Sequence, residues 1–144
     1  MQRWHTLAAY YNRHCGSRVQ KIPLDAGASC PNRDGTLSSF GCTFCNANGS
    51  GSGRAKQGDS LLQQWNALRA VYLRDDPNTR FIAYLQSFSN TYGPQKRLQQ
   101  LLQSVRSLPQ CFGVAVGTRP DCLDGPKLDI LAALDCDLWL ELGL

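Results

Sequence analysis

Phe112-Gly-Val-Ala-Val116, followed by Gly117-Thr-Arg-Pro-Asp121, is the stretch that decides the fold. The first five residues are short and almost continuously apolar, which is the pattern of a parallel strand buried on both faces. A helical pattern precedes them, with an apolar stripe at Leu98, Leu101, Leu102, Val105 and Leu108. A second helical pattern opens at Pro126 and would turn Leu128, Leu131 and Leu134 inward. We therefore predict an inner strand of a parallel sheet.

The same alternation extends outward along the chain. Strands are predicted over 18–24, 80–86, 112–116 and 138–142, and helices separate them. The first of these helices starts at Asp59 or Ser60 and buries Leu61, Trp65, Leu68 and Tyr72, and the second starts at Pro94. An earlier helix is predicted over 3–14, with Gly16 as its stop and with Trp4, Leu7, Ala8 and Tyr11 on one face. This order predicts an α/β fold of right-handed βαβ units.

The last predicted strand has no helix after it to cover it. A bare apolar edge strand is an aggregation liability. We therefore expect 1–144 to be the N-terminal part of a longer domain. Residues 1–17 would be a helical extension, and 18–144 would hold the βα units.

Composition limits the classes of protein that the chain can belong to. It has 144 residues, 42% of them hydrophobic and 18% charged, and a net charge of +4, which is too small to argue for a nucleic-acid partner. No apolar run reaches the ~20 residues of a membrane span or resembles a signal peptide. Seven cysteines cannot all pair within one chain. We predict a cytoplasmic protein without membrane contact, whose thiols are ligands, buried groups or redox groups.

Three of the cysteines lie close together in a Gly-, Asn- and Ser-rich loop. Cys30, Cys42 and Cys45 form a C-x11-C-x2-C pattern. Three thiolates are one fewer than the four ligands of a structural zinc site or of most cubane iron–sulfur clusters. A site with one ligand too few has an open position for chemistry. The spacing leaves an iron–sulfur site, a zinc site and unrelated thiols as interpretations.

Polar residues follow the carboxyl ends of the predicted strands, where functional residues of parallel α/β folds collect. The cysteine loop follows the first strand, and the other three ends carry 86–90, 118–121 and Glu141. Arg119 and Asp121 are either site residues or an ion pair in a turn, and Ser87 and Ser89 are either ligands or loop residues. Glu141 lies in an apolar strand and needs a partner if it is buried, for which Arg119 is the candidate.

Other polar and sulfur-containing residues receive structural interpretations. Arg33 and Asp34 are interpreted as turn residues, and His5 and His14 as distant from the motif. The remaining cysteines are interpreted as small buried or half-buried thiols, with Cys122 nearest the rim: Cys15, Cys111, Cys122 and Cys136.

Four segments resemble the radical S-adenosylmethionine (SAM) superfamily, and within it a bacterial YhcC-type family related to the Elongator catalytic subunit. They are Val19-Gln-Lys-Ile-Pro-Leu24, Ser29-Cys-Pro-Asn-Arg-Asp-Gly-Thr36, Gly41-Cys-Thr-Phe-Cys-Asn46 and Gly117-Thr-Arg-Pro-Asp-Cys122. Glu141-Leu-Gly143 is similar to a motif of the same branch. The usual spacing in the superfamily is C-x3-C-x2-C, and this chain departs from it with eleven residues in the first gap.

The resemblance implies a partial (βα) TIM-like barrel of six βα units, of which this chain holds about the first four strands. It implies a [4Fe-4S] cluster on Cys30, Cys42 and Cys45, with SAM chelating the fourth iron. A 5′-deoxyadenosyl radical would then abstract hydrogen from a substrate. Phe44 would lie near the SAM adenine. Cofactor-binding roles are implied for Gln86, Ser87, Ser89 and Thr118, although the Gly-Gly-Glu of many relatives is missing there, and catalytic or substrate-side roles for Arg119, Asp121 and Glu141.

The implied partners are a substrate, for which tRNA is a candidate from the Elongator branch, and an electron donor such as flavodoxin or ferredoxin. No basic stripe with interleaved aromatic residues supports tRNA. Two alternatives stay open. One is a zinc-stabilised module that binds nucleic acid or protein, with a fourth ligand from Cys15, Cys122 or a histidine. The other is an inactive, truncated remnant that folds poorly.

Overall fold

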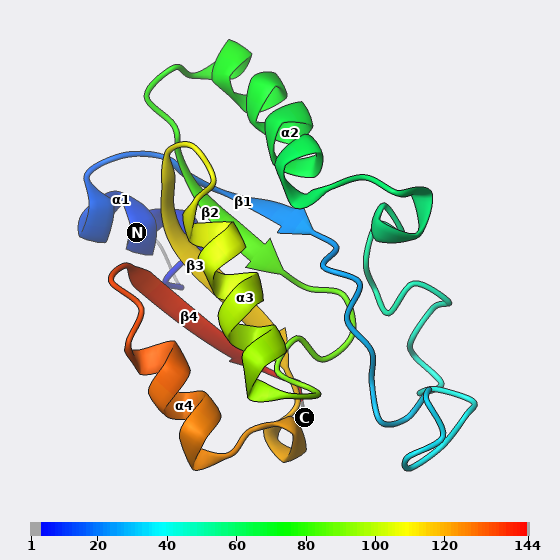
Figure 1. The fold of residues 1–144 in the computed structure, drawn as a ribbon. Coiled ribbons are helices and arrows are strands. Elements are labelled where there is room, and N and C mark those ends of the chain that lie inside the picture. Colours follow the sequence, from blue (N-terminus) through cyan, green and yellow to red (C-terminus); the bar gives the residue numbers. More distant parts are fainter. Residues whose placement is uncertain (1–3, 144) are drawn as a thin grey trace.

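A computed structural model describes residues 4–143 as a four-stranded parallel sheet covered by helices (Figure 1). The strands are β1 (Val19–Leu24), β2 (Arg80–Leu85), β3 (Cys111–Thr118) and β4 (Asp137–Leu142), and they lie in the sheet in that order. The connecting helices are α2 (Leu61–Asp75), α3 (Gln95–Arg106) and α4 (Gly125–Ala132). The predicted α/β fold with parallel βαβ units is thus confirmed. Within the described range, no helix is both long and apolar enough to cross a lipid bilayer.

Local capping explains where the helices begin. The Ser60 hydroxyl accepts from the Gln63 amide, and the Gln63 side chain accepts from the Ser60 amide, which forms a capping box at α2. At α4 the Asp124 carboxylate accepts from the Lys127 amide, without a reciprocal bond. Pro94 precedes α3 in extended geometry instead of occupying its first turn. The predicted starts are therefore correct to within one or two residues.

The N-terminal helix, α1 (Leu7–Cys15), is shorter than predicted. Thr6 accepts a hydrogen bond from the Ala9 amide and begins the helix there, and Gly16 ends it in the left-handed conformation. Trp4 lies before the helix and is 72% exposed, and Leu7 is also exposed, so the predicted apolar face reduces to Tyr11. Residue 3, where the predicted helix began, lies outside the described range.

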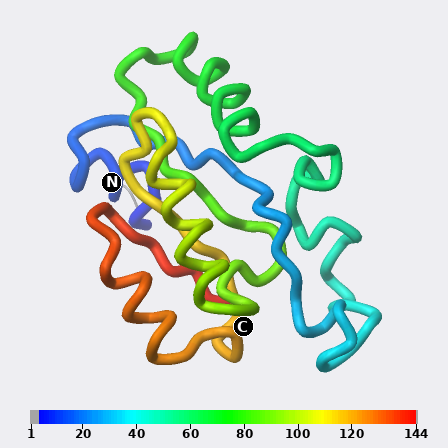
Figure 2. The backbone as a smooth tube through the Cα atoms, in the orientation of Figure 1, coloured from blue at the N-terminus to red at the C-terminus, as the bar shows by residue number. Residues whose placement is uncertain are grey.

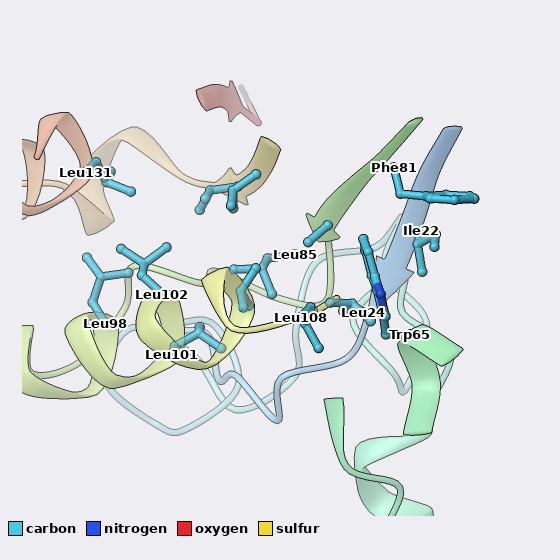
Figure 3. Packing of buried hydrophobic residues seen from close by; sticks show 14 residues of the cluster. Ile22, Leu24, Trp65, Phe81, Leu85, Leu98, Leu101, Leu102, Leu108 and Leu131 are labelled. Atoms are coloured by element: carbon cyan, nitrogen blue, oxygen red, sulfur yellow. The ribbon is translucent and has the colours of Figure 1, made fainter. Parts of the chain in front are cut away.

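Helices α2, α3 and α4 cover one face of the sheet and form the main core (Figure 3). Trp65 is fully buried there, and its Nε1 donates to the Pro109 carbonyl at 3.1 Å. Leu131 is buried as predicted, but Leu128 is 45% exposed, so the prediction that it points inward is wrong. The fully or nearly buried apolar side chains of this core include Ile22, Leu24, Phe81, Leu85, Leu98, Leu102, Val105, Val114 and Val116.

The opposite face of the sheet is covered only in part, by α1. Tyr11 packs there on Ile82 and Ala115 and meets the Trp139 ring edge-on at 5.6 Å. On this face Lys21 of β1 forms an ion pair with Glu141 of β4. Neighbouring strands are ~4.8 Å apart, so β1 and β4 would be ~14 Å apart in a flat sheet, beyond the reach of this pair. The sheet is therefore curved, and the ion pair lies on its concave face.

Residues 25–60 form a long excursion beyond the carboxyl ends of β1 and β2 (Figure 2). Its only helical turn is a short 3-10 segment, Ala55–Gln57. Both ends of the excursion are attached to the buried Gln64 of α2. The Gln64 side chain accepts from the Asp25 amide at 2.8 Å and donates to the carbonyls of Asp25 and Asp59 at 3.0 and 3.1 Å. Gln64 thus holds the two ends of the excursion together through hydrogen bonds.

Candidate functional site

A cavity of about 760 Å³ lies at the carboxyl ends of β2, β3 and β4, beside the cysteine loop that follows β1. The predicted convergence of the strand ends on one rim is therefore confirmed. Of the residues predicted for the site, all but Ser87 line this cavity: Cys30, Cys42, Phe44, Cys45, Gln86, Ser89, Thr118, Arg119, Asp121 and Glu141.

The cysteine loop folds back on itself, and residues from both parts of the long motif line the cavity. The Leu37 amide donates to the Pro31 carbonyl at 2.8 Å, and the Gly41 amide donates to the Asn32 carbonyl at 2.8 Å. The Cys45 amide then donates to the Cys42 carbonyl at 3.0 Å and closes the final C-x2-C turn. The eleven-residue gap is thus a closed loop.

Arg33 has a larger role than the turn residue that the sequence predicts. Its Nη2 donates to the carbonyls of Cys45 and Asn46 at 3.1 and 2.6 Å, and its guanidinium lies 5.6 Å from the centre of the Phe88 ring. A Cβ on Gly41 would lie 2.9 Å from the Arg33 Nε, so a larger residue at 41 would displace the guanidinium. Arg33 therefore joins both parts of the cysteine motif to the loop after β2.

The loop after β2 is interlocked with the glycine-rich segment. Phe88 has a positive φ of 59°, which is costly for a bulky residue, and its amide donates to the Gly49 carbonyl at 3.1 Å. Ser87 points to Gly51, where a Cβ would lie 1.8 Å from the Ser87 Oγ. Ser87 is buried, and unlike the other predicted site residues it is not among the residues that line the cavity.

Thr118 lines the cavity, and its hydroxyl proton is already donated to the Thr91 hydroxyl. The Thr91 Oγ1 donates to the Cys122 carbonyl at 2.8 Å, and it lies 2.7 Å from the Thr118 Oγ1. Since Thr91 has one hydroxyl proton, Thr118 must be the donor between them. The Thr118 oxygen can therefore only accept a hydrogen bond from a ligand.

Arg119 and Asp121 form an ion pair with each other at the rim. The Arg119 Nε and Nη2 donate to the two Asp121 oxygens at 2.8 and 2.7 Å. This bidentate hydrogen bonding lowers the pKa of Asp121 and raises that of Arg119. The prediction that Arg119 is the partner of Glu141 is therefore wrong. The ion pair between Arg119 and Asp121 is present, and both residues also line the cavity.

Glu141 instead pairs with Lys21, and its side chain is more than a third exposed. The Lys21 Nζ also lies 4.6 Å from the centre of the Tyr84 ring. Burial, followed by a hydrogen bond to Glu141 and its negative charge, raises the pKa of Tyr84 to about 12. Glu141 and Tyr84 line the cavity, so a ligand there would meet a paired carboxylate beside a neutral phenol.

All three cysteines of the motif are among the residues that line the cavity, and Phe44 offers an apolar ring that is 84% exposed. Across residues 4–143, no three His, Cys, Asp or Glu side chains are grouped closely enough to hold a single metal ion. The three thiolates of a cubane site bind different irons, so they do not need to converge on one ion.

The additional ligands that the zinc interpretation requires do not lie at the cavity. Cys15 belongs to α1 and packs on the concave face beside β1, and His14 stacks on Tyr10 of the same helix. Cys122 is buried and is not among the residues that line the cavity; its Sγ lies 3.8 Å from the Asp121 Oδ1, and burial raises the pKa of its thiol. As predicted, all four remaining cysteines are free thiols that are buried or half-buried.

Sequence reasoning missed five residues of this region: Lys21, Asn32, Arg33, Tyr84 and Phe88. The alternation of side chains along a strand could have indicated two of them. Lys21 and Tyr84 lie on the same face of the sheet as Trp139 and Glu141. The loop residues carry no periodic signal.

Comparison with known proteins gives three informative relatives. The chain is 41% identical over 145 residues to the uncharacterized protein YtqA of Bacillus subtilis, covering 99% of this chain and 45% of that protein. It is 38% identical over 135 residues to protein YhcC of Escherichia coli, covering 92% and 42%. It is 28% identical over 144 residues to the uncharacterized protein MJ0486 of Methanocaldococcus jannaschii, covering 94% and 42%.

The chain therefore spans less than half the length of the curated relatives that it matches. None of these three relatives has a name that states an activity. No family model matches the chain. No solved structure matches it.

Proposed function

We propose that this chain is part of a radical-SAM protein and holds a [4Fe-4S] cluster on Cys30, Cys42 and Cys45. The observation that carries the proposal is that the three cysteines line one cavity together with residues at the carboxyl ends of β2, β3 and β4. When bound, the cluster and SAM supply one-electron cleavage of the SAM sulfonium and hydrogen abstraction from a substrate. The scaffold's part is to bind, orient and shield these cofactors.

The residues around the thiols divide into apolar and polar surfaces. Phe44 and Phe88 present aromatic rings on the loop side, where a planar base can stack. Thr118 presents only an acceptor oxygen, which suits a donor such as an amine. The charged side chains at the rim are already paired, Arg119 with Asp121 and Glu141 with Lys21. A ligand that covers them would therefore not leave an unpaired charge buried.

The test is anaerobic reconstitution of the protein with iron and sulfide, followed by measurement of bound iron, sulfide and zinc. We expect about four irons and four sulfides per chain, and a large loss of both in Cys42→Ala. Cys111→Ala is the matched control, because Cys111 is the first residue of β3, at the opposite end of the strand from the cavity. Stoichiometric zinc without iron would reject the proposal and favour a zinc-stabilised module. Equal iron loss in Cys111→Ala would also count against it.

A further inference from the structure

Asn32 connects the first cysteine of the motif to the second. It lies two residues after Cys30, and its Nδ2 donates to the Cys42 Sγ at 3.1 Å. The two residues are ten positions apart in sequence, so this contact depends on the closed path of the loop. It reaches the sulfur itself, which is the atom that would bind iron.

The backbone holds the Asn32 carboxamide at this place. The Asn32 carbonyl accepts from the Gly41 amide at 2.8 Å, next to Cys42 in sequence. The Arg33 amide donates to the Cys30 carbonyl at 2.9 Å on the other side. Gly41 has a φ of +76°, which allows the chain to reverse directly before Cys42. Asn32 is thus fixed between two cysteines, and it also lines the cavity.

A donor aimed at a ligand sulfur has a predictable electrostatic effect. An N–H group stabilises negative charge on the sulfur, and a reduced cluster carries one electron more than an oxidised one. Hydrogen bonds to the sulfurs are among the factors that set the reduction potential of an iron–sulfur cluster. A donor at Cys42 therefore favours the reduced state and raises the potential.

We propose that Asn32 is a positioning residue that raises the reduction potential of a cluster bound by the three cysteines, through its hydrogen bond to the Cys42 sulfur. This inference rests on the proposed function. It also gives the unusually long gap between the first two cysteines a role, because the gap carries the donor to the second cysteine. The bond persists in both oxidation states and differs between them in strength.

The test is a redox titration of the reconstituted protein, with dithionite as the one-electron donor and EPR of the reduced cluster as the readout. Asn32→Leu removes the donor at similar size, and Asn32→Asp replaces it with an acceptor. We expect Asn32→Leu to lower the reduced-to-oxidised ratio about tenfold at a fixed potential, equivalent to ~59 mV for a one-electron couple. Asn32→Asp should lower the ratio further, and Asn32→Gln, which keeps a carboxamide, should lie nearer the wild type.

Asn78→Leu is the matched control, because Asn78 is an exposed asparagine before β2 and far from the loop. Its potential should equal that of the wild type. Where Asn32→Leu holds too little cluster for a titration, the Asp and Gln variants give the same comparison.

The outcomes separate this inference from the proposed function. A wild-type protein that binds no cluster would overturn both. A wild-type cluster whose potential is unchanged in Asn32→Leu and Asn32→Asp would overturn the inference alone. Loss of cluster content with an unchanged potential in the remaining fraction would also overturn it, because that result indicates a purely structural role.

Discussion

Gln64 is the residue whose replacement should most directly loosen the cysteine loop. It is fully buried, and its carboxamide makes three hydrogen bonds, two to the backbone of Asp25 and one to the carbonyl of Asp59. Asp25 begins the excursion that carries the cysteines, and Asp59 lies next to its last residue. Replacing Gln64 with Leu keeps most of the side-chain volume but removes every one of these bonds.

The expected cost follows from that count. Each hydrogen bond contributes about 1 kcal/mol net, and each buried backbone group left without a partner costs a further ~1–3 kcal/mol. Because solvent can reach part of the Asp59 end, we expect Gln64→Leu to lower the free energy of unfolding by about 3–5 kcal/mol. That is a large share of the ~5–15 kcal/mol by which a domain is usually stable.

Urea denaturation followed by circular dichroism measures this change, and limited proteolysis within 46–58 reports whether the loop is freed. Gln100→Leu is the matched control, because Gln100 is an exposed residue of α3, and it should change stability by less than ~0.5 kcal/mol. A loss below 1 kcal/mol in Gln64→Leu, with proteolysis as slow as in the control, would refute the reasoning. A non-cooperative transition in the wild type would instead favour the poorly folded remnant.

Three further predictions concern the site. Gly41→Ala should lower the free energy of unfolding by about 1–2 kcal/mol and also reduce iron incorporation, because the residue has a positive φ and its new Cβ would clash with Arg33. Gly58 is the control, since it has a similar φ but open space around it. In thermal melts and iron assays, Gly58→Ala should therefore show only the loss of stability. Glu141→Gln should lower the pKa of Tyr84 from about 12 but leave it above 10, because burial is the larger cause of the raised pKa. Ultraviolet titration of the phenol measures this pKa, and Tyr84→Phe assigns the signal. An unchanged pKa in Glu141→Gln would show that Glu141 is not the partner of Tyr84. Because the pKa of Tyr84 is raised in the folded protein, its contribution to the free energy of unfolding should be complete below pH 10 and should be lost as the pH rises toward 12. Urea denaturation at several pH values measures this loss, which should be smaller in Tyr84→Phe. An equal dependence on pH in both proteins would contradict the assignment.

The fold was predictable because its signals are local. The apolar run before Gly117, the caps at Ser60 and Asp124, and the stripe of α3 each specify an element within a few residues. The order of these elements then determines a parallel sheet. The positions of the polar residues at the rim were predictable for the same reason, because each of these residues directly follows the end of a strand or lies near it in sequence.

The partners within the site were not predictable, because they depend on long-range geometry. Glu141 pairs with Lys21 across two intervening strands, which requires a curved sheet that no local pattern specifies. Ser87 is buried against Gly51, which lies far along a loop without periodicity. Arg33 sits beside Cys45 only because the loop closes back at Gly41.

The most direct test of the central claim is EPR of the reduced, reconstituted protein with and without SAM. The account predicts a [4Fe-4S] signal that changes when SAM is added, because SAM would occupy the iron that the three cysteines leave open. Cys42→Ala should lack the signal. A cluster signal that is identical with and without SAM would contradict the claim that this cavity binds both cofactors.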